Sequence, residues 1–248
     1  MTTATFLDPA LPPHSLLATQ AEWLAPARSR LFRRIGIAHR KSVLDLGAGY
    51  GAVSAELSRR SSGRVIALDI ALHTLCEFSE GPNQLIFPVN GDGRTLPFPD
   101  NTFDLIFCQC TLMWINPLES AVREIQRTLQ PGGVLVALEP DYGGLIEYPP
   151  PLSTRDLWHS ALAKAGADPL TGRKLPELFA HHNLTMRISL LDELQPPSQL
   201  RFDFLRGLPL TSDQQQKLAE IEGLAAAIPA EHQVAHLPFF LVTAEKTH

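Results

Sequence analysis

A glycine-rich stretch near the N-terminus carries the first residues whose types and spacing could do chemistry. The residues VLDLGAGYG (43–51) place Gly47, Gly49 and Gly51 at alternate positions directly after an apolar run. With the alanine that follows, they fit G-x-G-x-x-A, a turn that brings the backbone close to a nucleotide-like ligand. The pattern leaves two ligands open: NAD bound through its pyrophosphate, or another adenosine ligand without a phosphate.

Two acidic residues lie close to this turn in the sequence. Asp69 ends the run RVIALD and suits a carboxylate that binds two ribose hydroxyls, which either ligand would carry. Asp45 lies two residues before Gly47, at the expected mouth of the site. A pyrophosphate at a helix N-terminus is stabilised by backbone N–H groups and destabilised by a nearby carboxylate. Asp45 therefore favours a ligand that carries an ammonium and a sulfonium, such as S-adenosylmethionine.

A third polar segment, NGDGR (90–94), follows another apolar run. Asp92 lies where a carboxylate could accept a hydrogen bond from an adenine amino group. The dipeptides N-G and D-G are also strong turn formers, so a solvent-exposed turn is an equally good interpretation of this segment alone.

Hydrophobic periodicity predicts the elements that must position these residues. Buried strands are expected at 42–46, 64–69, 85–90, 103–108 and 134–138, and helices at 52–60, 72–78 and 118–129. Strands that alternate with helices predict an α/β fold with a doubly wound, mostly parallel sheet. Such sheets bind ligands at the carboxyl ends of their strands, where 45–51, Asp69, 90–94, 108–114 and 139–144 are expected.

The two ends of the chain are less regular. A short helix is expected at 15–22, and a second helix is expected to begin at Pro26 and to end at Gly36. After residue 149 we expect helices at 152–164 and 175–182, a strand at 185–191, a polar helical insertion at 195–236 and a last strand at 238–244.

Taken together, VLDLGAGYG, the acid ending ALD, GDGRTLPFPDNTFDLIFC and LQPGGVLVALEP resemble class I S-adenosylmethionine-dependent methyltransferases. The resemblance covers residues 28–140 and is nearest to the type 11 subgroup, which includes quinone-ring methylases. It implies a Rossmann-like sheet of seven strands whose last strand is antiparallel. It also implies S-adenosyl-L-methionine as the cofactor and a small-molecule methyl acceptor as the partner.

The resemblance assigns site residues by position. The glycine turn, with Asp45 before it, would pass the methionine and ribose, and Asp69 with Ile70 would hold the ribose. Asp92 would meet the adenine amino group, flanked by Gly91, Gly93 and Arg94, and Cys108 and Gln109 would line the methionine side. The resemblance gives no role to Glu139, Asp141 and Tyr142, which are expected at the pocket mouth after the fifth strand. Trp114 and Tyr142 are candidate substrate contacts.

These expectations divide the chain into four parts. Residues 1–40 would form a helical lid segment, 41–194 the cofactor-binding core, 195–236 a substrate cap, and 237–248 the last strand and tail. The predicted reaction moves a methyl group to an O, N or C nucleophile, and no general base is singled out. An NAD-dependent oxidoreductase and a non-catalytic S-adenosylmethionine-binding protein remain alternatives.

Composition limits the partners. The net charge of −5 argues against nucleic-acid binding, and the one basic cluster is expected on the exposed face of a helix: Arg28, Arg30, Arg33, Arg34 and Arg40. No apolar run reaches the roughly 20 residues that span a bilayer, and the first residues do not read as a signal peptide, so the cytoplasm is expected.

The cysteines predict neither a disulfide framework nor a metal site. The chain has three, and Cys108 and Cys110 are expected on one face of a strand as buried side chains. No metal ligand set is predicted.

Overall fold

The fold is built around one seven-stranded sheet with the order β3-β2-β1-β4-β5-β9-β7. The computed structural model describes residues 12–76, 85–191, 193–194 and 196–247. Its strands are β1 Ser42–Leu46, β2 Arg64–Asp69, β3 Ile86–Asn90, β4 Phe103–Gln109, β5 Leu129–Pro140, β7 Leu184–Leu190 and β9 Phe239–Lys246. β9 pairs antiparallel with both β5 and β7, and the other pairings are parallel. The predicted Rossmann-like sheet with an antiparallel last strand is therefore confirmed.

Helices cover both faces of this sheet. The α-helices are α1 His14–Arg34, α2 Ala52–Arg60, α3 Leu72–Leu75, α4 Leu118–Thr128, α5 Arg155–Lys164, α6 Thr171–His181, α7 Leu200–Arg206 and α8 Ser212–Ala227. Leu24 and Phe32 of α1 and Leu57 of α2 pack with Val43 and Phe107 on one face. On the other face, side chains of α4 and α6 pack in a second cluster with alternate residues of the same strands.

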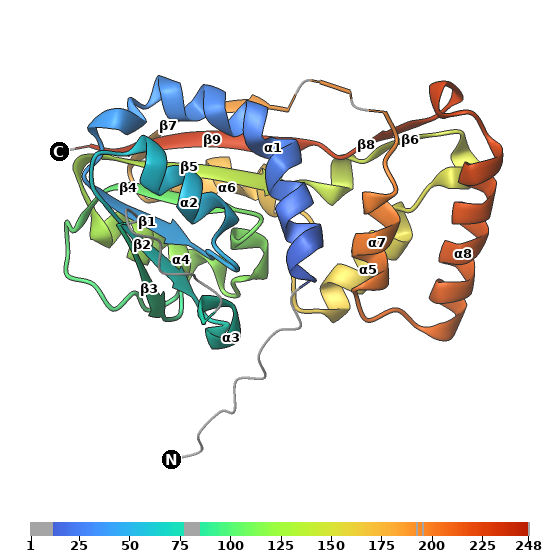
Figure 1. Ribbon diagram of the computed structural model, residues 1–248, viewed down its shortest axis with the longest axis horizontal. Coiled ribbons are helices and arrows are strands. Elements are labelled where there is room, and N and C mark those ends of the chain that lie inside the picture. The colour runs from blue at the N-terminus through green and yellow to red at the C-terminus, as the bar shows by residue number, and fades with distance from the viewer. Residues whose placement is uncertain (1–11, 77–84, 192, 195, 248) are drawn as a thin grey trace, which may run out of the picture.

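A third apolar cluster lies beyond the sheet. It joins α5, α7 and α8 through buried side chains that include Trp158, Phe202 and Ile221. A two-stranded antiparallel sheet of β6 Ile146–Tyr148 and β8 Val234–His236 lies beside it. Figure 1 shows these elements gathered at one end of the molecule, and we refer to residues 145–165 and 196–236 together as the cap. None of the short strands of the cap was predicted from the sequence.

The N-terminal helix differs from its prediction. Residues 14–34 form one continuous helix, with Pro26 inside it rather than at the start of a second helix. An interior proline removes one backbone hydrogen bond and costs about 3 kcal/mol. Burial of Leu24, Leu31 and Phe32 against the sheet offsets that cost. The helix expected at 72–78 ends at Leu75, and residues 77–78 lie outside the described residues.

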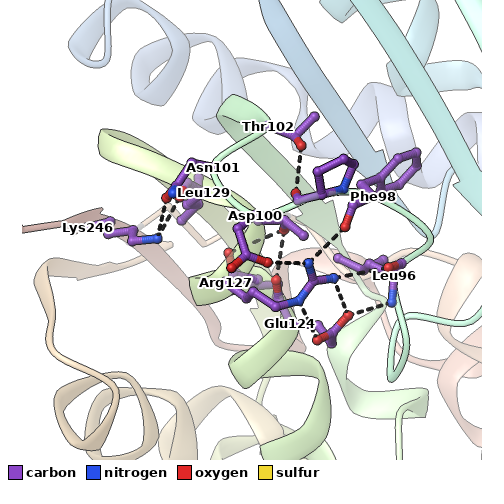
Figure 2. A network of polar contacts seen from close by, with 12 residues as sticks. Leu96, Phe98, Asp100, Asn101, Thr102, Glu124, Arg127, Leu129 and Lys246 are labelled. Carbon is purple, nitrogen blue, oxygen red and sulfur yellow. Dashed lines mark hydrogen bonds and ion pairs between the residues drawn. The ribbon is translucent and has the colours of Figure 1, made fainter.

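A polar network fixes the loop that precedes β4. Arg127 of α4 donates to the carbonyl oxygens of Leu96 and Phe98 and pairs with Asp100, at N···O distances between 2.8 and 3.1 Å. Glu124, one turn earlier on α4, accepts a hydrogen bond from Leu96 N at 2.8 Å. Figure 2 shows this network holding the segment from Leu96 to Thr102 against α4. The network thereby anchors the polypeptide that leads from Arg94 to β4.

In the described part of the chain, every helix is either too short or too polar to cross a membrane.

Candidate functional site

The glycine turn connects β1 to α2 at the carboxyl end of the sheet. Gly47, Gly49 and Gly51 all have positive φ, at 75°, 51° and 81°. A Cβ atom at Gly47 would lie 2.3 Å from the Thr111 side chain, so this position needs glycine for space as well as for conformation. The turn therefore presents backbone, not side chains, to whatever binds above it.

Asp69 at the end of β2 is hydrogen-bonded to this turn. Its Oδ2 accepts from Gly49 N at 2.7 Å, and its Oδ1 accepts from Ala71 N at 2.8 Å. The neighbouring Ile70 side chain is 42% exposed, so an apolar surface lies next to the acid. Gly91 N donates to Asp69 O at 3.0 Å, which brings the start of the 90–94 segment to the same place.

Asp45 is buried, although it was predicted to lie at the mouth of the site. Its side chain is 2% exposed, and it accepts a hydrogen bond from Ser54 Oγ of α2 at 2.5 Å. Burial raises the pKa of Asp45 to about 7, and the charge of Asp69 adds to the rise, while Ser54 and Arg28 oppose it. Asp45 would therefore act on a bound ligand through its charge, from beneath α2.

Asp92 and Arg94 form an ion pair in the third segment. Arg94 donates to Asp92 Oδ2 at 2.6 Å from Nη2 and to Asn116 O at 3.1 Å from Nη1. The Arg94 guanidinium lowers the pKa of Asp92, which keeps the carboxylate ionised. A Cβ atom at Gly93 would lie 2.8 Å from Ile115 Cδ1, so this loop is packed against the segment after β4.

The residues at the end of β4 point to opposite faces of the sheet. The Cys108 side chain is fully buried in the cluster beneath α4, so its thiol does not face the glycine turn. Gln109 faces α1 instead, because its Oε1 accepts a hydrogen bond from Arg28 Nη1 at 2.9 Å.

The expectation that Cys108 and Cys110 share a strand face is wrong. β4 ends at Gln109, and Cys110 turns away with a φ of 54° to pack in the cluster beneath α1. Within the described residues, His, Cys, Asp and Glu side chains form no group of three or more that could hold a metal ion.

Arg28 is a central residue that sequence reasoning missed. It was expected on an exposed basic face, but its side chain is buried, whereas Arg30, Arg33 and Arg34 are exposed as predicted. Its Nη2 lies 2.6 Å from Glu56 Oε2 of α2. With its bond to Gln109, Arg28 joins α1, α2 and the end of β4 around the glycine turn. A pairing of residues this far apart leaves no local signal in the sequence.

Glu139 was expected at the pocket mouth, and the structure buries it completely. Its Oε1 accepts from Thr111 N and Leu112 N, each at 2.9 Å, so it fixes the turn that follows β4. Burial raises the pKa of Glu139 to about 7. Asp141 is also buried and pairs with Arg173 of α6, 2.7 Å away. Both acids therefore hold backbone and helices in place.

Next to this edge lies a cavity of about 270 Å³ between α1, the end of β5 and the cap. Aromatic side chains form much of its wall, including Trp23 of α1, Phe204 of α7, and Tyr142, which packs on Trp158 of α5 with ring centroids 4.6 Å apart. Tyr142 is therefore where a substrate contact would lie. The 41% exposed Trp114 is not among the residues that line this cavity.

A second cavity, of about 770 Å³, opens between α4, α6 and the loop that joins α5 to α6. None of the predicted cofactor residues lines either cavity, and of the two candidate substrate contacts, Trp114 and Tyr142, only Tyr142 lines a cavity, the smaller one.

Comparison with known proteins finds a family match for the part of the chain that carries this arrangement. Residues 44–137 match the family model described as a methyltransferase domain. This range contains the glycine turn, Asp69, Asp92 and the end of β4. The chain contains a methyltransferase domain.

Relatives of this methyltransferase domain differ in their named activities. The chain is 36% identical over 125 residues to the ubiquinone/menaquinone biosynthesis C-methyltransferase UbiE of Hahella chejuensis, covering 44% of this chain and 49% of that protein. It is 37% identical over 93 residues to the mitochondrial arginine-hydroxylase NDUFAF5 of Rattus norvegicus, covering 38% of this chain and 27% of that protein. The chain thus matches half or less of the length of these two relatives.

A solved structure agrees on the fold over a longer range. The YcgJ protein of Bacillus subtilis superposes with a TM-score of 0.66 at 17% identity, covering 89% of this chain and 99% of that one. The likeness therefore extends through the Rossmann-like sheet beyond the methyltransferase domain match.

Proposed function

We propose that this protein transfers a methyl group from S-adenosyl-L-methionine to an O, N or C nucleophile of a small molecule. The observation that carries the proposal is the meeting of three segments of the methyltransferase domain at one edge of the sheet. The glycine turn, Asp69 and the 90–94 segment are joined there by the bonds from Gly49 N and Gly91 N to Asp69.

The residues at this edge fit the proposed cofactor. Asp69 uses one oxygen for each backbone bond, so further lone pairs remain for two ribose hydroxyls. The exposed Ile70 side chain offers an apolar surface for the adenine ring, with the ionised Asp92 available to its amino group. The glycine turn and Gln109 would pass the methionine part.

The bound cofactor would supply an electrophilic methyl group, and the protein would orient the acceptor and exclude water. Orientation of this kind is worth about 7–11 kcal/mol when the reacting atoms are held in line. The cavity beside Tyr142 would hold the acceptor, because its wall combines this predicted substrate contact with residues of α1 and of the cap. We assign no general base.

The charge around the turn separates this proposal from an NAD-dependent oxidoreductase. Asp45 and Asp69 lie close enough for the charge of Asp69 to raise the pKa of Asp45. Asp69 would hold a ribose of either ligand, so the distinction rests on Asp45, whose negative charge disfavours a pyrophosphate and favours a ligand with an ammonium and a sulfonium. A non-catalytic S-adenosylmethionine-binding protein would use the same contacts, and consumption of the methyl donor with a cell extract distinguishes it from an enzyme.

Replacement of Asp69 tests the cofactor assignment. In equilibrium dialysis, Asp69→Ala should weaken S-adenosylmethionine binding by more than about tenfold, because charge-assisted hydrogen bonds to the ribose are lost. Asp104→Ala is the matched control. Asp104 also accepts two backbone N–H groups, from Lys41 and Ser42, at the opposite ends of the strands. Equal affinities of the two variants for S-adenosylmethionine would show that Asp69 is not part of the cofactor site.

A further inference from the structure

Among the described residues, a single cationic side chain lines the cavity between α1 and the cap. Arg201 of α7 lies in a wall that is otherwise mostly aromatic and aliphatic. Its Nε and Nη1 atoms are buried, and among the described residues neither has a hydrogen-bond partner. A buried guanidinium nitrogen without an acceptor costs free energy, so an arrangement of this kind is typical of a site that binds an acceptor group.

The Phe202 ring packs against the Arg201 guanidinium but accepts no hydrogen bond from its Nε or Nη1 atoms. Its Cζ lies 4.5 Å from the centroid of the Phe202 ring, which is itself buried. Burial lowers the pKa of Arg201, but arginine remains protonated in proteins, so the charge stays in the wall of the cavity.

Glu147 is the one acid among the described lining residues, and it does not bond to Arg201. Its Oε1 accepts from Thr154 Oγ1 at 2.6 Å, and its Oε2 accepts from Thr154 N at 2.8 Å and from Ser153 Oγ at 3.0 Å. Glu147 is therefore committed to the start of α5. Its charge favours the charged state of Arg201 at a distance but supplies no acceptor to Nε or Nη1.

We propose that the methyl acceptor is a small apolar or aromatic carboxylic acid whose carboxylate binds Arg201. A second O, N or C nucleophile of the same molecule forms the bond to the methyl carbon as the bond from the cofactor's sulfur to that carbon breaks, which leaves S-adenosylhomocysteine. A carboxylate supplies the missing acceptor in a charge-assisted hydrogen bond, and Tyr142, Trp158 and Phe204 supply apolar contact for the rest of the molecule. A volume of about 270 Å³ lies near the lower end of the range for small-molecule sites, which favours a compact ligand.

The identity of this ligand as the methyl acceptor rests on the proposed function, but its binding can be measured without a methyl donor. Titration calorimetry of the full chain would use two matched pairs of probes: indole-3-acetate with indole-3-acetamide, and 3-phenylpropanoate with 3-phenylpropanamide. Each pair has the same apolar body and differs in charge. We expect the wild-type protein to bind at least one acid about tenfold more tightly than its amide.

Variants of α7 assign that preference to one residue. Arg201→Gln should remove the preference for the acid and leave the affinity for the amide unchanged, while Arg201→Lys should keep part of it. Arg206→Gln is the control, because Arg206 lies on the same helix, outside the cavity, and pairs with Asp203 and Glu222. Circular dichroism and the melting temperature establish that each variant is folded.

The proposal is overturned if the wild-type protein binds neither acid, binds acids and amides equally, or keeps its preference in a folded Arg201→Gln variant. These outcomes are separate from failure of the proposed function. A carboxylate preference without S-adenosylmethionine binding would refute methyl transfer and keep the Arg201 site. S-adenosylmethionine binding without a carboxylate preference would refute the Arg201 site and leave the proposed methyl transfer standing.

Discussion

At the scale of single residues, Asp45 shows how position determines electrostatic effect. It is enclosed by the sheet and α2, and its pKa of about 7 places its titration near neutrality. A cationic ligand above the turn would stabilise the ionised carboxylate and lower that pKa. Binding would then release a proton wherever the free protein still holds one, and affinity would depend on pH.

The sign of this dependence is a first prediction. Between about pH 5.5 and pH 8, the affinity for S-adenosylmethionine should increase as the pH rises, and it should level off about one unit above the Asp45 pKa of about 7, where the carboxyl group is almost fully ionised. Calorimetric titrations over this range measure the trend. Asp45→Asn, which keeps an acceptor for Ser54 Oγ, should flatten it. A rise of the same size in the variant would show that another group titrates.

Residue types at the glycine turn could be predicted from the sequence, and residue pairings could not. Gly47 and Asp69 follow from local spacing at strand ends, where a positive φ and a terminal acid are needed. The partners of Arg28 and the missing partners of Arg201 depend on helices packed from distant parts of the chain. No pattern within one segment contains that information.

At the scale of elements, α4 acts on the site through the loop before β4. Arg127 and Glu124 bind backbone groups of that loop, whose other end carries Asp92 and Arg94. The motif LPFPDNTFDLIF (96–107) contributed to the family resemblance, but no site residue was predicted within it. In the structure, the Leu96–Thr102 part of it is the clamped segment of Figure 2.

Loss of the polar network between α4 and the loop before β4 should destabilise the protein, which is a second prediction. Arg127→Ala should lower the free energy of unfolding by about 2 kcal/mol, because several charge-assisted bonds at a partly exposed side chain are lost. Urea denaturation measures this change, and amide hydrogen exchange should accelerate in the loop around Leu96. Arg123→Ala, at an exposed position on the same helix, is the control. Similar unfolding curves for the two variants would show that the contacts of Arg127 do not contribute to stability.

Helices and strands with a clear hydrophobic pattern could be predicted from the sequence, whereas those that depend on tertiary packing could not. β1 and β2 have the predicted bounds, because buried parallel strands give continuous apolar runs. α1 continues through Pro26, since burial against the sheet outweighs the local preference for a break. β6 and β8 are three residues each and pair across a long stretch of sequence, so they produce no local signal.

At the scale of the whole molecule, the chain combines a methyltransferase domain with a cap that has its own apolar cluster. The proposed cofactor contacts lie at the carboxyl edge of the sheet, and the proposed acceptor cavity lies between α1 and the cap. Figure 1 shows α1 running between the sheet and α7, which is where a lid over both sites would lie. The lid role of residues 1–40 and 195–236 remains a prediction.

Equilibrium dialysis of the wild-type protein against S-adenosylmethionine and NAD measures whether the glycine turn binds a methyl donor. Because the charge of Asp45 favours a cationic ligand at the turn, we expect S-adenosylmethionine to bind with a micromolar dissociation constant, worth about −8 kcal/mol, and NAD to be retained at least about tenfold more weakly. Retention of NAD without retention of S-adenosylmethionine would show that the glycine turn does not bind a methyl donor.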